Sequence, residues 1–275
     1  MNFLYAVIMG IIQGLTEFLP VSSSGHLAIF EIVFGVESPG LLFDVLLHIG
    51  TLIAVFLCFY KDIFQMIKEL FLMIADLFRG KKKIVNNTYR KMDLLVIVAT
   101  IPTGIIGVFD SDLVEKAGKI LIFPGVCLIL TGLILLLADR LPDGDKTPKK
   151  TSYTNAFLIG IAQGAATLPG ISRSGSTITA CLFSRFQRNY AVKFSFILSI
   201  PAILGSLVFE LTDIDAAAIS GSDVLCYVVG TAVAAVVGYI SIKLMLRIVR
   251  RKKFLPFAIY CFAIGAASVI GYFLI

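Results

Sequence analysis

Almost all charged side chains of this sequence are confined to short intervals between long uncharged runs. There are 24 Lys and Arg and 18 Asp and Glu, and all but two of them lie in seven such intervals. The runs between the intervals are apolar, and the mean hydropathy of the chain is +0.93. Only 15% of the residues are charged, whereas a soluble domain has about 25%. A water-soluble globular enzyme is therefore excluded, and we expect a polytopic membrane protein.

Six uncharged runs are long enough to cross a bilayer, which takes about 20 largely apolar residues in a helix. They are centred on residues 45–60, 94–109, 120–138, 194–209, 224–242 and 254–275. Two further apolar stretches, 1–34 and 153–183, are each interrupted by proline, serine and glycine. The expected fold class is thus an all-α integral membrane protein with six transmembrane helices plus two re-entrant helix-loop-helix pairs.

The charged intervals divide by sign. Lys and Arg number eight, four, three and six in the intervals 61–93, 139–152, 184–193 and 243–253. Such intervals are expected on the cytoplasmic side, and the net charge of +6 indicates contact with anionic lipid and not with nucleic acid. Intervals 31–44 and 209–223 contain acids and no base, and 110–119 is mixed. With these three outside, the first broken stretch enters from outside and the second from the cytoplasm.

An internal repeat supports opposite topology of the two halves. A shift of 150 residues places Gly10–Gly14 on Gly160–Gly164, and seven of the sixteen positions from 10 to 25 are identical. Paired inverted units led by broken helices are a transporter architecture, with sites at the repeat interface. We expect a single membrane domain over 1–275, with a first repeat 1–138, a cytoplasmic linker 139–152 and a second repeat 153–275.

Glu17 and Arg173 are the two charges outside the seven intervals, and each lies at a broken-helix loop. A charge inside a bilayer costs several kcal/mol even on lenient scales, about 2.5–3.5 per residue. Two opposite charges at repeat-related loops therefore suggest one shared site. An ion pair that only staples the two halves together is the structural alternative.

The two loops carry groups suited to phosphate chemistry. Serines can cap a helix whose N-terminus then offers backbone N–H groups to an anion, and Arg binds phosphate through two donors. We expect a phosphate to be bound by Gln13, Ser22, Ser24, Gly25, Ser172, Ser174 and Gly175. The expected catalytic groups are Ser23, His26, Glu17 and Arg173.

Nucleophilic phosphoryl transfer fits this set. Ser23 would attack, His26 or Glu17 would move protons, and Arg173 would stabilise charge. Ser23 and His26 stand three residues apart, so their side chains can meet across one helical turn. His26 as the nucleophile remains open, and Glu17 could also hold a divalent cation.

Other features have structural interpretations. His48 has no cluster of acid, arginine or serine near it in sequence, and we expect it to be structural. The Gly10/Gly14 and Gly160/Gly164 pairs are expected to be helix-packing faces. The five cysteines have no CxxC spacing and predict neither disulfides nor a zinc site.

The two loops also carry a family resemblance. Gln13-Gly-Leu-Thr-Glu17-Phe-Leu-Pro-Val-Ser-Ser-Ser-Gly-His26 and Leu168-Pro-Gly-Ile-Ser-Arg173-Ser-Gly-Ser-Thr177 resemble the undecaprenyl-diphosphate phosphatase family, also called bacitracin-resistance proteins. The resemblance continues through Lys193–Pro201 and Phe254–Tyr260 and covers essentially the whole chain. Its functional positions correspond to Glu17, Ser23, His26 and Arg173. The family's first acidic motif is E/Q-x-x-x-E, and this chain has Gln13 at the variable place, which leaves Glu17 as the sole acid.

The resemblance implies hydrolysis of undecaprenyl diphosphate, a polyprenyl lipid, to undecaprenyl phosphate and inorganic phosphate. This reaction recycles the carrier for peptidoglycan synthesis, maintains cell shape and gives bacitracin resistance. It also implies a bacterial plasma-membrane protein, a site opening to the extracytoplasmic side, and dependence on Mg²⁺ or Ca²⁺. The oligomeric state stays open, a homodimer included. A secondary transporter or lipid flippase that recognises a polyprenyl phosphate is the alternative function, whereas the buried charges are too few for a channel.

Overall fold

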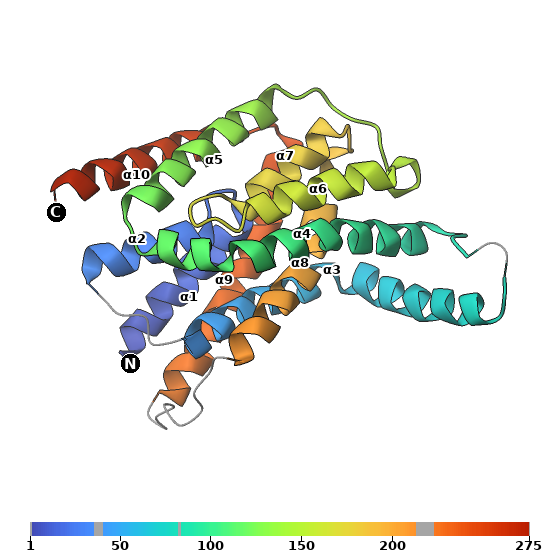
Figure 1. The fold of residues 1–275 in the computed structure, drawn as a ribbon, viewed down its shortest axis with the longest axis horizontal. Helices are drawn as coiled ribbons and strands as arrows, with labels where there is room; N and C mark the ends of the chain where they lie inside the picture. The colour runs from blue at the N-terminus through green and yellow to red at the C-terminus, as the bar shows by residue number, and fades with distance from the viewer. Residues whose placement is uncertain (1, 36–40, 82–83, 213–222, 275) are drawn as a thin grey trace.

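Ten α-helices and one short 3₁₀ helix make up the described part of the chain (Figure 1). The computed structural model describes residues 2–35, 41–81, 84–212 and 223–274. Parts of the predicted intervals 31–44, 61–93 and 209–223 therefore lie outside the described residues. In chain order the helices are α1 (Phe3–Phe18), α2 (Ser23–Phe34), α3 (Leu41–Phe78), α4 (Thr88–Gly118), α5 (Ile122–Arg140), η1 (Pro148–Lys150), α6 (Tyr153–Ala165), α7 (Arg173–Phe183), α8 (Arg188–Thr212), α9 (Val224–Arg250) and α10 (Leu255–Leu274).

Six of these helices are long and apolar enough to cross a membrane, namely α3, α4, α5, α8, α9 and α10. They coincide with the six uncharged runs, so that prediction is confirmed. The other two apolar stretches are helix pairs, α1 with α2 and α6 with α7, each broken where proline, glycine and serine interrupt the sequence. The described residues thus form an all-helical structure whose six long apolar helices fit a multi-pass membrane protein.

Most of the charged interval 61–93 is helical, although we expected it only to connect two membrane-spanning helices. α3 has non-helical backbone at Phe59 (φ −119°, ψ 21°) and continues to Phe78, and α4 begins at Thr88. Arg90 donates hydrogen bonds to Glu69 and Asp76, each at 2.8 Å, and so joins the extensions of α3 and α4. Counting uncharged runs alone missed this extension, because a helix that leaves the apolar layer can carry charges paired with its neighbour.

Ion pairs connect the four basic intervals to one another. Asp143 accepts hydrogen bonds from Lys252 at 2.8 Å and from Arg188 at 2.6 Å. These two bonds hold the pKa of Asp143 below its ordinary value of 3.8, so its carboxylate is charged at neutral pH. Lys193 likewise pairs with Asp62 at 2.9 Å. The intervals expected on one side of the membrane thus meet at one end of the molecule.

Glycines permit close packing of the two broken helix pairs against long helices. A Cβ at Gly10 would lie 2.6 Å from the Gly230 carbonyl oxygen of α9, and one at Gly14 would lie 2.8 Å from the Ala234 carbonyl oxygen. A Cβ at Gly160 would overlap the backbone of Ala99 in α4. Small residues let helix backbones approach in this way. The expectation that both glycine pairs are packing faces is confirmed.

Candidate active site

The two interrupted loops lie against each other. Ser22 Oγ accepts hydrogen bonds from the backbone N–H groups of Gly25, at 3.3 Å, and Gly170, at 3.2 Å. Ser174 Oγ donates to the Leu19 carbonyl oxygen at 3.3 Å. A Cβ at Gly25 would stand only 2.7 Å from Gly170 Cα, so the backbones are nearly in contact. Two motifs about 150 residues apart in sequence therefore form one structure.

Three serines of this structure are buried and shape its backbone. Ser22 caps α2 with a positive φ of 69°, and Ser172 caps α7 by accepting from Gly175 N at 3.0 Å. Ser22, Ser172 and Ser174 are each at most 5% exposed, whereas Ser24 is exposed. The caps satisfy only some of the backbone N–H groups at each helix start. Binding of substrate by these serines and by both glycines stays a prediction.

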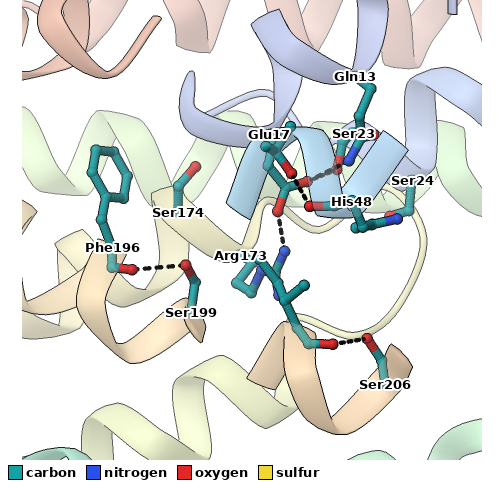
Figure 2. Close-up of polar contacts among 12 residues, drawn as sticks. Gln13, Glu17, Ser23, Ser24, His48, Arg173, Ser174, Phe196, Ser199 and Ser206 are labelled. Carbon is teal, nitrogen blue, oxygen red and sulfur yellow. Dashed lines mark hydrogen bonds and ion pairs between the residues drawn. The ribbon is translucent and has the colours of Figure 1, made fainter. Parts of the chain in front are cut away.

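The two charges within the apolar part of the sequence meet at this junction. Arg173, the first residue of α7, donates from Nη2 to Glu17 Oε1 near the end of α1 (Figure 2). The Glu17 side chain is 3% exposed and that of Arg173 is 25% exposed. The expectation that the two charges come together is confirmed, and their role as one functional site stays a prediction. Whether the pair is catalytic or a structural staple depends on what surrounds it.

Ser23 lies next to this pair. Its Oγ donates to the other carboxylate oxygen, Glu17 Oε2, at 2.6 Å, and Gln13 Nε2 donates to the same oxygen at 3.2 Å (Figure 2). Gln13 is completely buried, and its Oε1 has no hydrogen-bond partner. Glu17 thus faces a hydroxyl and a guanidinium at once. A carboxylate in this position can accept the hydroxyl proton while Arg173 attracts an anion.

His26 has partners other than Ser23. Its Nδ1 lies 2.7 Å from the Ser22 carbonyl oxygen, which can only accept, so Nδ1 carries the proton. Nε2 then accepts from Tyr260 Oη of α10 at 2.8 Å, and the two rings stack with centroids 5.5 Å apart. The expected Ser23–His26 contact is therefore replaced by two others, because a carboxylate from α1 and a phenol from α10 lie closer to these groups.

A comparison with known proteins identifies the family. A family model described as bacitracin resistance protein BacA matches residues 6–267. The chain belongs to this family. It is 43% identical to an undecaprenyl-diphosphatase of Alkaliphilus metalliredigens over 96% of this chain and 97% of that protein. Undecaprenyl-diphosphatases of Methanobrevibacter smithii and Methanosphaera stadtmanae are 42% and 40% identical, each over 98% of both chains.

The candidate site also contains residues that the sequence did not single out. A small pocket beside Glu17 and Arg173 is lined by Ser195 and Ser199 of α8. These serines stand one helical turn apart within an apolar run, and that spacing was the available signal. Ser195 bonds Thr177 of α7 and so connects the pocket wall to the helix that bears Arg173.

His48 of α3, expected to be structural, also lies near Glu17. Its side chain lies close enough to Glu17 for an electrostatic interaction, and Figure 2 draws it with Glu17 and Ser24. Its Nδ1 donates to the Asp44 carbonyl oxygen at 2.9 Å, which leaves Nε2 as an acceptor. The expectation that His48 is structural stays a prediction, and the sequence distance to Glu17 concealed only that the two side chains are near each other.

The donor set around Glu17 suits a cation that arrives with phosphate. Within the described ranges no three His, Cys, Asp or Glu side chains cluster as a metal site. Glu17 and the unpartnered Gln13 Oε1 are oxygen donors of the kind that Mg²⁺ and Ca²⁺ prefer. Mg²⁺ is commonly held by one or two carboxylates with the substrate's own phosphates. The residues present fit that kind of site.

Proposed function

We propose that this protein hydrolyses undecaprenyl diphosphate to undecaprenyl phosphate and inorganic phosphate. Family membership and relatives named undecaprenyl-diphosphatase support the substrate. The observation that carries the chemistry is Ser23 Oγ, 2.6 Å from one oxygen of Glu17 while Arg173 pairs with the other. The product is the lipid carrier that peptidoglycan synthesis consumes, and its recycling accounts for resistance to bacitracin.

In the first step, Ser23 Oγ attacks the terminal phosphorus and its proton passes to Glu17 Oε2. A bond forms between Oγ and phosphorus as the phosphoanhydride bond breaks. Undecaprenyl phosphate departs and takes the proton from Glu17. Arg173 and the first backbone N–H groups of α2 and α7 bind the phosphate oxygens and stabilise their charge. Arg173 has five N–H donors, so it can turn toward phosphate with those that Glu17 does not use.

In the second step, water attacks the phosphoserine. Glu17 takes a proton from the water and delivers it to Ser23 Oγ as the serine–phosphorus bond breaks. Inorganic phosphate is released and the starting state returns. His26 as the nucleophile is the rival assignment, but its Nδ1 bonds Ser22 and its Nε2 bonds Tyr260. These contacts favour Ser23.

A divalent cation, Mg²⁺ or Ca²⁺, belongs to this proposal as a companion of the diphosphate. Glu17 would hold it, with Gln13 Oε1 as a second oxygen ligand. When bound, the cation neutralises charge on the phosphate oxygens. Gln13 would then bind the cation at the position that the family's motif allows to be either Gln or Glu.

The proposed topology is a pair of inverted repeats, 1–138 and 153–275, joined by the linker 139–152. Helix packing supports it: α1 lies on α9 as its counterpart α6 lies on α4, and α5 lies on its own counterpart α10. The broken pairs α1–α2 and α6–α7 would be re-entrant from opposite sides. The basic end of the molecule would face the cytoplasm, with the site open to the extracytoplasmic side of the plasma membrane.

Phosphate release in detergent micelles tests the proposed function. Micelles have no transmembrane gradient, so transport cannot produce a chemical product there. We expect purified full-length protein to release inorganic phosphate from undecaprenyl diphosphate, and the Ser23→Ala variant to release none above background. Tight lipid binding without phosphate release would instead favour a secondary transporter or lipid flippase.

A further inference from the structure

The described residues form a second hollow, larger than the pocket at Glu17. It is a groove of about 410 Å³ between α5, α6 and α7, within the size range of small-molecule sites, about 300–1,000 Å³. Its walls are almost entirely apolar and include Ile134 and Leu137 of α5, Leu158 and Ala162 of α6, and Ala180 and Phe183 of α7. The mechanism above does not use this groove.

All three walls of the groove converge on the second phosphate loop. Thr131 of α5 donates to the Gly170 carbonyl oxygen at 2.9 Å and accepts from Ser172 N at 3.0 Å. α6 ends at Ala165, where that loop begins, and α7 starts at Arg173. Ile171, the residue before the capping Ser172, itself lines the groove. One end of the apolar groove therefore adjoins the loop that bears the phosphate-binding arginine.

The groove follows α7 away from that loop. Ser176, Ala180 and Phe183 line it in turn, at the spacing of one helix face. Since α7 has 11 residues, it is about 16 Å long at 1.5 Å per residue. The groove is also open sideways: Leu137 is 48% exposed and Leu158 is 53% exposed. A long apolar chain could thus start at the phosphate loop, follow α7 and leave into the bilayer.

We propose that this groove binds the isoprene units nearest the diphosphate of the polyprenyl substrate, a role that rests on the proposed function. A prenyl chain fits as the occupant because the groove continues from the phosphate-binding loop. The lipid's charged end requires Arg173 and the α7 N-terminus, and its chain must leave from there through apolar surroundings. Small side chains at Ala162 and Ala180 leave the width that the chain fills. The distal units remain in the bilayer, so the groove selects for a prenyl chain without measuring its full length.

Filling the groove tests the assignment. We expect Ala180→Phe and Ala162→Phe each to raise the KM for undecaprenyl diphosphate and for farnesyl diphosphate about tenfold or more, in line with the loss of apolar pocket contacts. The kcat should change little, because Glu17, Ser23 and Arg173 are not among the residues that line the groove. The matched control is Ala232→Phe, the same change at an exposed position of α9, which should leave KM unchanged.

A photoreactive farnesyl diphosphate that bears a diazirine on its chain provides a readout independent of turnover and of the filling variants. With the Ser23→Ala protein, crosslinks should map to peptides of α5, α6 and α7 that include Leu137, Leu158 or Phe183, and undecaprenyl phosphate should compete. Crosslinks confined to other helices would overturn the assignment. So would an active enzyme whose filled variants keep a normal KM, which would leave the groove to acyl chains of bilayer lipids. A wild-type protein that shows the crosslinks and releases no phosphate would refute the proposed function and not the groove.

Discussion

Glu17 receives hydrogen bonds from three side chains that belong to different helices or turns of the chain. Gln13 comes from the same helix, Ser23 from the next one and Arg173 from the other half of the molecule. A buried carboxylate needs such partners, since removing a charge from water costs several kcal/mol or more. The contacts that stabilise Glu17 also place a nucleophilic hydroxyl beside it. Stability and chemistry therefore depend on the same few residues.

Arg173→Lys should be nearly as damaging as Arg173→Ala. An ammonium keeps the charge but loses the planar two-pronged geometry that matches both carboxylate and phosphate. We expect kcat/KM for undecaprenyl diphosphate to fall at least about 100-fold in both variants, as for removal of one preorganised donor. Most activity retained by the Lys variant would show that charge alone matters.

A double variant distinguishes a catalytic role of Glu17 and Arg173 from a purely structural one. If Glu17 and Arg173 only hold the two halves together, Glu17→Gln with Arg173→Gln should remove both buried charges and recover folding and activity. The mechanism above predicts that the double variant folds, judged by gel filtration in detergent, and stays inactive. Recovery of phosphate release would contradict the catalytic assignment.

Among the contacts between helices, those made through glycine leave the least room for a larger side chain. α6 carries the second loop and packs on α4, where Gly160 has no room for a side chain. Gly104 of α4, by contrast, has no atom within 4 Å of an added Cβ. The two glycines therefore form a matched pair for testing the interface.

Gly160→Ala should destabilise the protein by about 1–3 kcal/mol, as overpacking does. Gly104→Ala should be neutral or stabilising, because alanine favours a helix over glycine by roughly 0.5–1 kcal/mol. The measurement is the apparent midpoint of thermal unfolding in detergent. Equal midpoints for the two variants would contradict the close approach of α6 to α4.

Much of this architecture could be predicted from the sequence, and the reason is the bilayer. Charges are so costly there that uncharged runs located the six long helices, and the isolated pair Glu17 and Arg173 located the site. The partner of Ser23 was not predictable, because Glu17 and His26 are both within reach of it along the chain. Whether Ser23 bonds Glu17 or His26 depends on how α10 places Tyr260 against His26.

The positions of other residues near Glu17 escaped prediction for a related reason. Ser195, Ser199 and His48 lie on long apolar helices whose rotation about their own axes is fixed only by tertiary packing. An apolar run does not specify which face is turned toward the loops. The extension of α3 beyond Phe59 was missed because its stabilising ion pairs involve residues of α4.

For the whole molecule, the end at which the four basic intervals meet predicts the orientation in the membrane. Glu37 and Asp215, in intervals expected outside, lie beyond the described residues, but Lys119 and Lys149 are described and exposed. With the five native cysteines replaced, Lys119→Cys should react with a membrane-impermeant thiol reagent in intact cells. Lys149→Cys should react only after lysis. The reverse pattern would overturn the positive-inside assignment.

The identity of the phosphorylated residue decides whether Ser23 is the nucleophile. Full-length protein and its His26→Ala variant would be mixed with undecaprenyl diphosphate in micelles, quenched with acid or base, and mapped by mass spectrometry under conditions that preserve either phosphoserine or phosphohistidine. We expect phosphate on Ser23 in both proteins, slower to form without His26, and none in Ser23→Ala. Phosphate on His26, trapped from the Ser23→Ala variant, would contradict it.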